Sequence, residues 1–344
     1  MSYKALFTTK IPHHSSHSGY EQLIKYVNAD EVLARLRENT SQPLKLTIER
    51  ILRRLSVSRW YQWDGIETEL KTVDLSRRYG SDLIAHFLYG DTAIGLLPYF
   101  KKWIKAKIVL SIHACPSDLA DVLQYPKALK HIDRLVLLGS NQRSFFLNNG
   151  IPEANVTVVP HGIDLDYFKP SAANEPISDQ FDILIVGNWR RDFVFYRNLI
   201  EHIPDQSPFN FHIVTADFNR HYFEGLANVT LYNKISDARL LHFYQQADAM
   251  LLAVKDAVAN NVLLEAMACG LPIVCEKTGA LPEYLGTDYR LFFEKNSVDE
   301  ALSKLETVQD SAKQKKISKY LVERSKRYNW HAIADQLNKM YQTL

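Results

Sequence analysis

The sequence predicts an α/β protein with two Rossmann-like domains that face each other across a cleft. Three observations lead to this prediction: a length of 344 residues, two series of short apolar runs that alternate with helical segments, and a Pro-, Ala- and Asn-containing segment between the series. A chain of this length exceeds one ordinary hydrophobic core and fits two domains of about 170 residues. Short apolar runs separated by helices are typical of parallel sheets that helices cover on both faces.

Each series of apolar runs predicts the strands of one domain. The N-terminal domain is expected over residues 1–168, with strands at 3–8, 83–87, 108–112, 135–140 and 156–160, and a helical segment at 20–27. Residues 169–178 have the composition of a linker. The C-terminal domain is expected over 179–326, with strands at 181–187, 211–214, 229–231, 249–252 and 272–275, followed by a C-terminal helix within 327–344.

Composition and charge narrow the class of protein. Hydrophobic residues make up 46% and charged residues 23% of the chain, which is typical of a soluble globular enzyme. No apolar run reaches the roughly 18–20 residues that span a bilayer, and the first residues lack the apolar core of a signal peptide. Three cysteines without metal spacing indicate free thiols in a reducing compartment. We therefore expect a cytoplasmic protein.

The net charge of +2 is unevenly distributed along the chain, because residues 1–170 carry +5 and the remainder carries −3. A basic first half favours an anionic partner, such as a phospholipid surface or a polyprenyl-phosphate carrier, and no nucleic-acid module is present. Residues 48–63 combine arginines and tryptophans with an apolar side, and residues 100–105 are similar. Both suit an interfacial helix on the inner face of the plasma membrane, although a solvated helix with a packed side remains the alternative.

One glutamate lies inside an apolar helix expected at residues 260–270. Asn260 or Asn261 can cap its start and Gly270 can end it. Glu265 shares a helix face with Asn261 and is expected to point away from a packed stripe formed by Val262, Leu263, Ala266 and Met267. Free N–H groups at the helix start suit a phosphate, and a carboxylate suits hydroxyls. The pattern indicates a nucleotide site, with a solvated glutamate as the alternative.

Residues 264–274 resemble the nucleotide-sugar motif of retaining GT-B glycosyltransferases of family 4. The resemblance implies that Glu265 binds the donor's ribose hydroxyls and that backbone amides at Val262 and Leu263 hold its diphosphate. Residues 159–170 are similar to the interdomain signature of that family. The GT-B fold then implies that the final helix, at about 330–343, packs back towards the N-terminal domain.

The chain departs from the family pattern at the donor-sugar contact. The family places a second acid eight residues before the ribose glutamate, and Ala257 occupies that position here. Asp256 is the candidate for the displaced role, with Asn260 as a helper. The alternative is that Asp256 is a residue of a polar loop with no contact to the donor sugar.

Two arginines follow a glycine at the end of a buried strand. Gly187 lets a ligand approach the backbone, and Arg190 and Arg191 can clamp a diphosphate because a guanidinium is a fixed, bidentate cation. In similar enzymes, basic residues of this region neutralise the leaving diphosphate without a metal. A solvated basic loop paired with Asp192 is the alternative.

His113 comes just past a strand of the first domain, where the resemblance implies a histidine that contacts the donor sugar; a lone histidine is otherwise more often structural.

Gly19 ends a loop that occupies the place of the family's glycine-rich turn, with a solvated loop as the alternative. His13, His14 and His17 lie in this loop, but they lack a fourth strong ligand, so we expect no metal.

The resemblance to this family implies a retaining, hexosyltransferase-type enzyme that needs no metal or cofactor. The donor would be a nucleotide-diphosphate sugar, with UDP the commonest base in the family, and the acceptor a glycan or lipid-linked sugar in cell-surface polysaccharide or glycoconjugate synthesis. The alternatives are another GT-B sugar-nucleotide enzyme such as an epimerase, and a degenerate scaffold that binds a nucleotide or partner without turnover. An NAD enzyme is disfavoured because Gly187 lacks the rest of a dinucleotide fingerprint.

Overall fold

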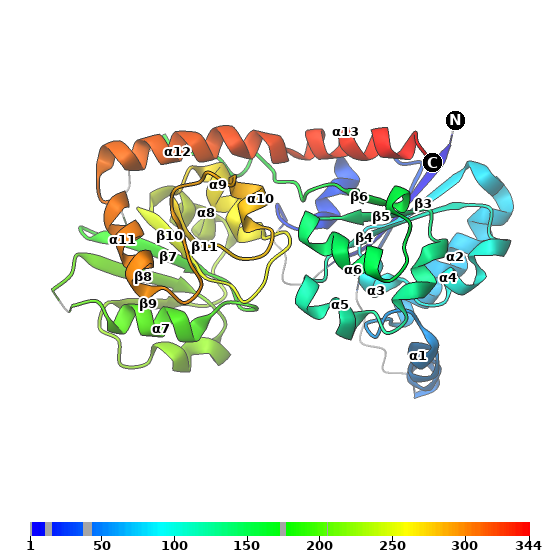
Figure 1. The fold of residues 1–344 in the computed structure, drawn as a ribbon, viewed down its shortest axis with the longest axis horizontal. Coiled ribbons are helices and arrows are strands. Elements are labelled where there is room, and N and C mark those ends of the chain that lie inside the picture. The colour runs from blue at the N-terminus through cyan, green and yellow to red at the C-terminus, as the bar shows by residue number, and fades with distance from the viewer. Residues whose placement is uncertain (1, 11–15, 37–42, 173–176, 205) are drawn as a thin grey trace. The chain divides into compact units, whose positions relative to one another are not determined.

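The computed structural model describes residues 2–10, 16–36, 43–172, 177–204 and 206–344 (Figure 1). The chain forms two compact units, Met1–Gly162 with Trp330–Leu344, and Ile163–Asn329. The segment 169–178, predicted to be a linker, falls inside the second unit, and its residues 173–176 lie outside the described part of the chain. His13 and His14 also lie outside it.

The first unit contains a six-stranded parallel sheet in the order β2-β1-β3-β4-β5-β6. Its strands are β1 (Tyr3–Lys10), β2 (Glu31–Leu36), β3 (Leu83–Phe87), β4 (Lys107–Ile112), β5 (Arg134–Leu137) and β6 (Val156–Val158). The sequence predicts the other five strands but not β2, which is rich in helix-forming Glu, Leu, Ala and Arg. This edge strand forms because its backbone pairs in register with β1.

Helices surround this first sheet. They are α1 (Pro43–Leu55), α2 (Trp63–Tyr79), α3 (Gly90–Ala93), α4 (Leu97–Phe100), α5 (Pro116–Val122), α6 (Arg143–Asn148) and α13 (Trp330–Tyr341). Short 3₁₀ turns are η1 (Tyr20–Lys25), η2 (Gly80–Asp82), η3 (Lys101–Trp103), η4 (Pro126–His131), η5 (Ser140–Gln142) and η6 (Glu153–Asn155). The helical segment predicted at 20–27 is thus the 3₁₀ turn η1.

The C-terminal helix α13 packs on the first unit, at the place that the GT-B resemblance implies. Trp330 at its start contacts Tyr20 and Tyr26. Near its end, the Tyr341 hydroxyl lies 2.5 Å from Nδ1 of His86, a fully buried residue of β3. The His86 Nε2 lies 2.8 Å from the hydroxyl of Ser111 on β4. A buried polar chain therefore ties the last helix to the centre of the sheet.

The second unit contains another six-stranded parallel sheet, in the order β12-β11-β10-β7-β8-β9. Its strands are β7 (Phe181–Val186), β8 (Phe209–Val214), β9 (Val229–Tyr232), β10 (Ala249–Leu252), β11 (Ile273–Glu276) and β12 (Phe292–Phe293). All but the two-residue β12 are predicted from apolar runs. Counted from β7, this is the 3-2-1-4-5-6 order of doubly wound nucleotide-binding sheets, read from the β9 edge.

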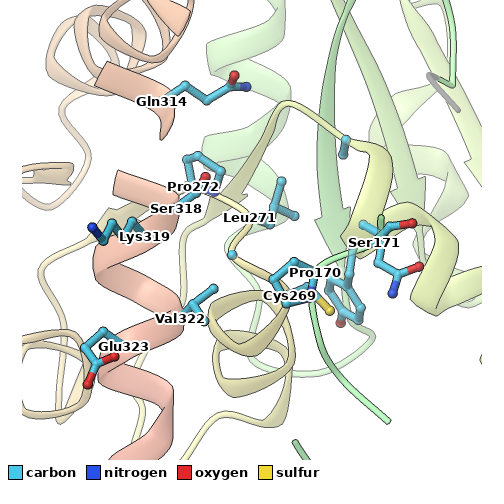
Figure 2. Close-up of a pocket in the computed structure, with 14 residues that line it drawn as sticks. Pro170, Ser171, Cys269, Leu271, Pro272, Gln314, Ser318, Lys319, Val322 and Glu323 are labelled. Carbon is cyan, nitrogen blue, oxygen red and sulfur yellow. The ribbon is translucent and has the colours of Figure 1, made fainter. Parts of the chain in front are cut away.

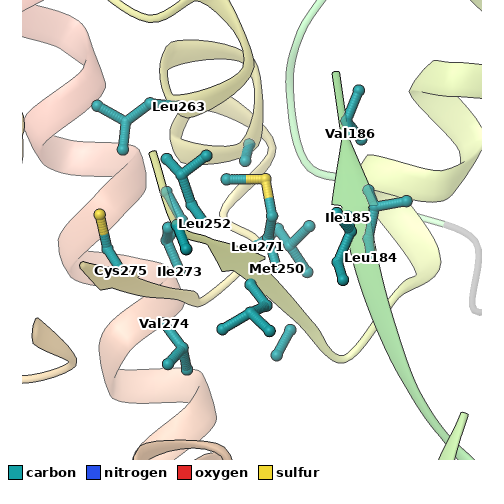
Figure 3. Packing of buried hydrophobic residues seen from close by; sticks show 14 of the residues in the cluster. Leu184, Ile185, Val186, Met250, Leu252, Leu263, Leu271, Ile273, Val274 and Cys275 are labelled. Atoms are coloured by element: carbon teal, nitrogen blue, oxygen red, sulfur yellow. The ribbon is translucent and has the colours of Figure 1, made fainter. Parts of the chain in front are cut away.

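The helices of this unit cover both faces of the sheet. They are α7 (Phe193–Glu201), α8 (Asp237–Gln246), α9 (Asn261–Cys269), α10 (Leu281–Leu285), α11 (Val298–Val308) and α12 (Ser311–Ser325), with 3₁₀ turns η7 (Asp217–Phe223) and η8 (Lys326–Tyr328). Helix α9 packs against α8 and α12. Figure 3 shows part of the core, in which Leu263 of α9 belongs to the same buried cluster as Val186 of β7, Leu252 of β10 and Ile273 of β11.

Within the described residues, no helix combines the length and apolarity that a membrane crossing requires. The three cysteines, Cys115, Cys269 and Cys275, are buried, and no disulfide joins them.

The buried His86 generates a testable pH dependence. Burial lowers the pKa of its imidazole from 6.5 to about 3, with a smaller contribution from the charge of His113. The unfolded chain therefore binds a proton below pH 6.5 that the folded chain excludes, so His86 reduces stability as the pH falls. Relative to a His86→Gln variant, the wild-type free energy of unfolding should fall by about 1 kcal/mol per pH unit between about pH 6 and pH 4.

Urea denaturation of both proteins at several pH values measures this difference. Because other groups titrate equally in both, the difference between the two curves isolates His86. If the free energy of unfolding changed with pH equally in both proteins, the His86 imidazole would not be buried in its neutral form.

Candidate functional site

The switch point of the second sheet lies between β7 and β10, where the chain leaves the two central strands in opposite directions. The loop after β7 lies against the segment after β10, because Arg191 forms an isolated antiparallel bridge with Val254. The Lys255 N–H donates to the Arg190 carbonyl (3.0 Å) and the Asp192 N–H to that of Ala253 (3.1 Å). The structure thus brings both predicted loops together at the sheet edge where doubly wound domains bind ligands.

Arg191 is a buried cation at this edge. Its side chain is 9% exposed and its Nε donates to the Val186 carbonyl at 2.7 Å. Within the described part of the chain, the guanidinium makes no other hydrogen bond and no ion pair. Burial lowers the pKa of Arg191, and the charges of nearby groups, including Glu265, partly oppose this. The remaining N–H groups are therefore available to an anionic ligand.

Gly187 makes room for this guanidinium. A Cβ built at Gly187 would lie 2.6 Å from the Arg191 Nε and 2.7 Å from its Cζ, and the glycine has a φ of +130°. Arg190 is half-buried and also has a positive φ, of +59°. The next residue, Asp192, is the N-cap of α7 and accepts from the Phe195 N–H at 3.0 Å. The two arginines thus differ, since Arg191 is enclosed and Arg190 lies nearer the solvent.

Helix α9 follows the segment that pairs with this arginine loop. Asn260 is its N-cap and accepts a hydrogen bond from the Leu263 N–H at 3.2 Å, and Gly270 ends the helix with a φ of +76°. Both ends agree with the sequence prediction. Asn261 and Val262 are half-buried in the first turn, where free N–H groups and the helix dipole favour an anion.

Glu265 is only 4% exposed, and its carboxylate accepts a hydrogen bond from the Tyr244 hydroxyl at 2.8 Å. The expected two-sided helix is wrong at this point, because α9 is buried on nearly all sides and Leu264, Ala268 and Cys269 are buried as well. The predicted alternative of a solvated glutamate does not hold. Tyr244 on α8 was not predicted, since nothing in the sequence couples it to a residue 21 positions later.

Asp256 lies in a loop held by the segment after β11. Its Oδ1 accepts from the Ala257 N–H at 2.8 Å, and the Ala280 N–H donates to the Ala257 carbonyl at 3.0 Å. A Cβ at Gly279 would lie 2.2 Å from that carbonyl, so this close approach requires glycine. Glu276, at the end of β11, is a further buried carboxylate that the sequence analysis missed, and burial raises its pKa.

Gly19 and His113 belong to the first unit, whereas the other predicted site residues lie in the second. Gly19, with a φ of +97°, precedes η1. The His113 ring stacks on Tyr89 with ring centroids 4.5 Å apart, meets Tyr20 edge-on at 4.9 Å, and its Nε2 donates to the Leu88 carbonyl at 2.7 Å. Gly19 directly precedes Tyr20, whose ring contacts His113 and whose hydroxyl accepts from Ser111 of β4 at 3.3 Å.

A cavity of about 430 Å³ opens at the other end of α9 (Figure 2). Its lining includes Tyr244, Cys269, Pro170 and Lys319 but neither Glu265 nor Arg191. Burial raises the pKa of the Cys269 thiol, so this thiol is not activated. The cavity is separate from the residues at the switch point. Among the described residues, no group of three or more His, Cys, Asp or Glu side chains is placed to hold a metal ion.

Comparisons with known proteins concern the family and the fold. Residues 218–328, inside the second unit, match the family model of "Glycosyl transferases group 1". The chain is 23% identical over 253 residues to a phosphatidylinositol N-acetylglucosaminyltransferase protein of Arabidopsis thaliana, a match that covers 64% of this chain and 51% of the relative. The chain thus spans about half the length of the curated relatives it matches.

Solved structures match over nearly the whole chain. Sucrose-phosphate synthase from Thermosynechococcus elongatus superposes with a TM-score of 0.72 at 16% identity, covering 99% of this chain and 98% of that one. HepE of Anabaena, solved in complex with UDP-glucose, gives a TM-score of 0.72 at 15% identity over 99% of this chain and 100% of the other. The chain therefore has the two-domain GT-B fold, and residues 218–328 of its second unit match the glycosyl transferases group 1 family.

Proposed function

We propose that the protein is a retaining glycosyltransferase of the family 4 type, which transfers a hexose from a nucleoside diphosphate sugar to a glycan or lipid-linked acceptor. The observation that supports this best is the buried Arg191 guanidinium, which has unused N–H groups and lies in a loop paired with the segment that leads into α9. A buried cation without a carboxylate partner is costly unless an anion completes it. A diphosphate has the charge and the oxygen geometry to do so.

Other residues of the second unit offer groups that suit the phosphates and the ribose of a nucleotide. The Val262 amide and the helix dipole at the start of α9 favour phosphate oxygens, whereas the Leu263 amide already donates to the Asn260 side chain. Glu265, held by Tyr244, offers a fixed acceptor for the ribose hydroxyls. During transfer, negative charge builds up on the departing diphosphate, and fixed cations that need no reorganisation stabilise it. In this proposal Arg191 makes the main contribution to stabilising the diphosphate, and Arg190 assists from the solvent side.

The donor sugar would be oriented by Asp256, with Asn260 as a helper, and by His113 of the first unit. No metal enters this proposal, since the arginines and the helix start supply the positive charge. The leaving phosphate would take the proton of the attacking acceptor hydroxyl. HepE was solved with UDP-glucose, which supports a uridine donor. The curated relative transfers N-acetylglucosamine to phosphatidylinositol by its name, which supports a lipid-linked acceptor.

A Glu265→Gln substitution should weaken nucleoside diphosphate binding by about 1–3 kcal/mol, or roughly 5- to 150-fold, because the charged acceptor for the ribose is lost. Calorimetric titration of the metal-free protein with UDP, GDP, ADP and NAD measures this. Glu306→Gln, at an exposed position of α11, is the matched control and should bind like wild type. Equal affinity in Glu265→Gln and wild type would show that this carboxylate does not bind ribose.

A Gly187→Ala substitution should also weaken the binding of the nucleoside diphosphate, because the new Cβ displaces the Arg191 guanidinium. Gly225→Ala is the control for backbone strain, since Gly225 has a φ of +82° and open space around it. Both variants should lose some stability in thermal unfolding, but only Gly187→Ala should lose nucleotide affinity. If the two variants bound the nucleoside diphosphate with equal affinity, the Arg191 guanidinium would not be part of the binding site.

Arg191→Gln should lower kcat for sugar transfer by about 10²- to 10³-fold, because a positioned charge on the leaving group is lost. Arg190→Gln should have a smaller effect, since its side chain is more exposed and less firmly placed. Steady-state kinetics with a sugar nucleotide and an acceptor panel measure both. If the donor binds but neither the wild type nor a variant transfers sugar to any acceptor, the protein is a scaffold that binds a nucleotide without turnover, and the transferase proposal is wrong. Conversion of the donor without acceptor would instead identify an epimerase.

A further inference from the structure

Helix α1 presents an apolar face that no other described part of the chain covers. Leu44, Ile48, Ile51 and Leu55 follow each other at the spacing of one helical stripe. Leu44 is 73%, Ile51 54% and Leu55 59% exposed, and Ile48 is half-buried. A helix of a soluble domain normally buries such a stripe against its own core. Here the stripe faces outwards.

The outward orientation of α1 is fixed by its opposite side. Glu49 is buried on that side and accepts hydrogen bonds from Arg53, one turn later, and from the Trp63 N–H at 3.1 Å. Arg53 also donates from Nε to the Tyr61 carbonyl at 2.9 Å. The only acidic side chain of the helix is therefore turned inwards and neutralised, while the apolar stripe is held towards the solvent.

Basic side chains flank the stripe. Lys45, Arg50 and Arg54 lie on α1, and the exposed Arg59 follows it next to Trp60, which is 42% exposed. Among the described residues, none of these four cations forms an ion pair. An apolar stripe edged by cations has the composition of a helix that lies in the headgroup region of an anionic bilayer.

A second apolar region adjoins α1. A groove of about 760 Å³ is lined by Leu52 of α1, Leu70 of α2 and Trp103 of η3, among other largely apolar residues. Trp103 is 67% and Leu70 66% exposed, and the ammonium of Lys102 lies 4.3 Å from the Trp103 ring centroid. Lys105 also lines the groove. The stripe and the groove thus share one helix, and both combine apolar side chains with lysine or arginine.

We propose that α1 and this groove form a docking surface for an anionic membrane leaflet. The stripe enters the boundary between headgroups and acyl chains, the flanking cations contact lipid phosphates, and Trp60 and Trp103 lie at headgroup depth. The cations favour this occupant over a second copy of the chain, because two such surfaces would place like charges together. The proposal concerns only the first unit and extends the proposed function, since it would bring a lipid-linked acceptor to the enzyme.

Sedimentation of the full chain with lipid vesicles tests the proposal. At low salt the wild type should bind vesicles of equal parts phosphatidylglycerol and phosphatidylcholine, and should not bind pure phosphatidylcholine measurably. The variant Leu44→Ser/Ile51→Ser/Leu55→Ser should bind about tenfold or more weakly, because the apolar stripe is lost. These side chains are exposed, so the variant should fold normally. Val194→Ser, at a 66% exposed position of α7, is the matched control.

A charge variant separates the two contributions to binding. Arg50→Gln/Arg54→Gln should also weaken binding by about tenfold and reduce its dependence on salt. Lys315→Gln/Lys316→Gln, on exposed positions of α12 in the second unit, should leave both unchanged. In all of these variants nucleoside diphosphate binding should equal that of wild type, so a failure of the proposed function is seen separately.

Several outcomes would overturn the proposal. The absence of wild-type binding to anionic vesicles at low salt is one, and binding that survives loss of the apolar stripe is another. A third is a wild-type dimer in light scattering that the triple serine variant dissociates, together with no vesicle binding. That result would assign the stripe to contact between two copies.

Discussion

The candidate site depends on one buried cation, the guanidinium of Arg191. A charge in a protein interior needs compensation, and this one receives a single backbone carbonyl at Nε together with nearby tyrosines and Glu265. Its position requires a glycine at 187, since a Cβ there would occupy the same space. The loop is then fixed from the other side by its pairing with the segment after β10. The nucleotide-binding geometry that we propose follows from these constraints.

The sheet order places this cation where it can act. Because β7 and β10 are neighbours whose chains leave in opposite directions, their loops meet at the carboxyl edge of the sheet. Helix α9 starts from the second loop and carries Glu265 just over one turn later. Backbone amides, a guanidinium and a carboxylate therefore come from two loops and one helix, with strands that are buried on both faces as a rigid support. Precise placement of this kind is what electrostatic catalysis requires.

Much of this arrangement could be predicted from the sequence, because its signals are local. Apolar runs mark ten of the strands, Asn260 and Gly270 mark the ends of α9, and Gly187 marks a strand end. Features that depend on residues distant in sequence could not be predicted. The burial of Glu265 comes from α8 and its Tyr244, and the choice between Arg190 and Arg191 depends on a positive φ at Arg190. Strand β2 was missed because pairing with β1 overrides its helical composition.

The central claim is that a nucleoside diphosphate binds with its phosphates at Arg191 and its ribose at Glu265. A crystal structure of the protein with UDP tests it most directly. The account predicts diphosphate oxygens within hydrogen-bond distance of the Arg191 guanidinium and of the amides that begin α9, and ribose hydroxyls on the Glu265 carboxylate. Phosphates bound away from Arg191, or a ribose that does not reach Glu265, would contradict it.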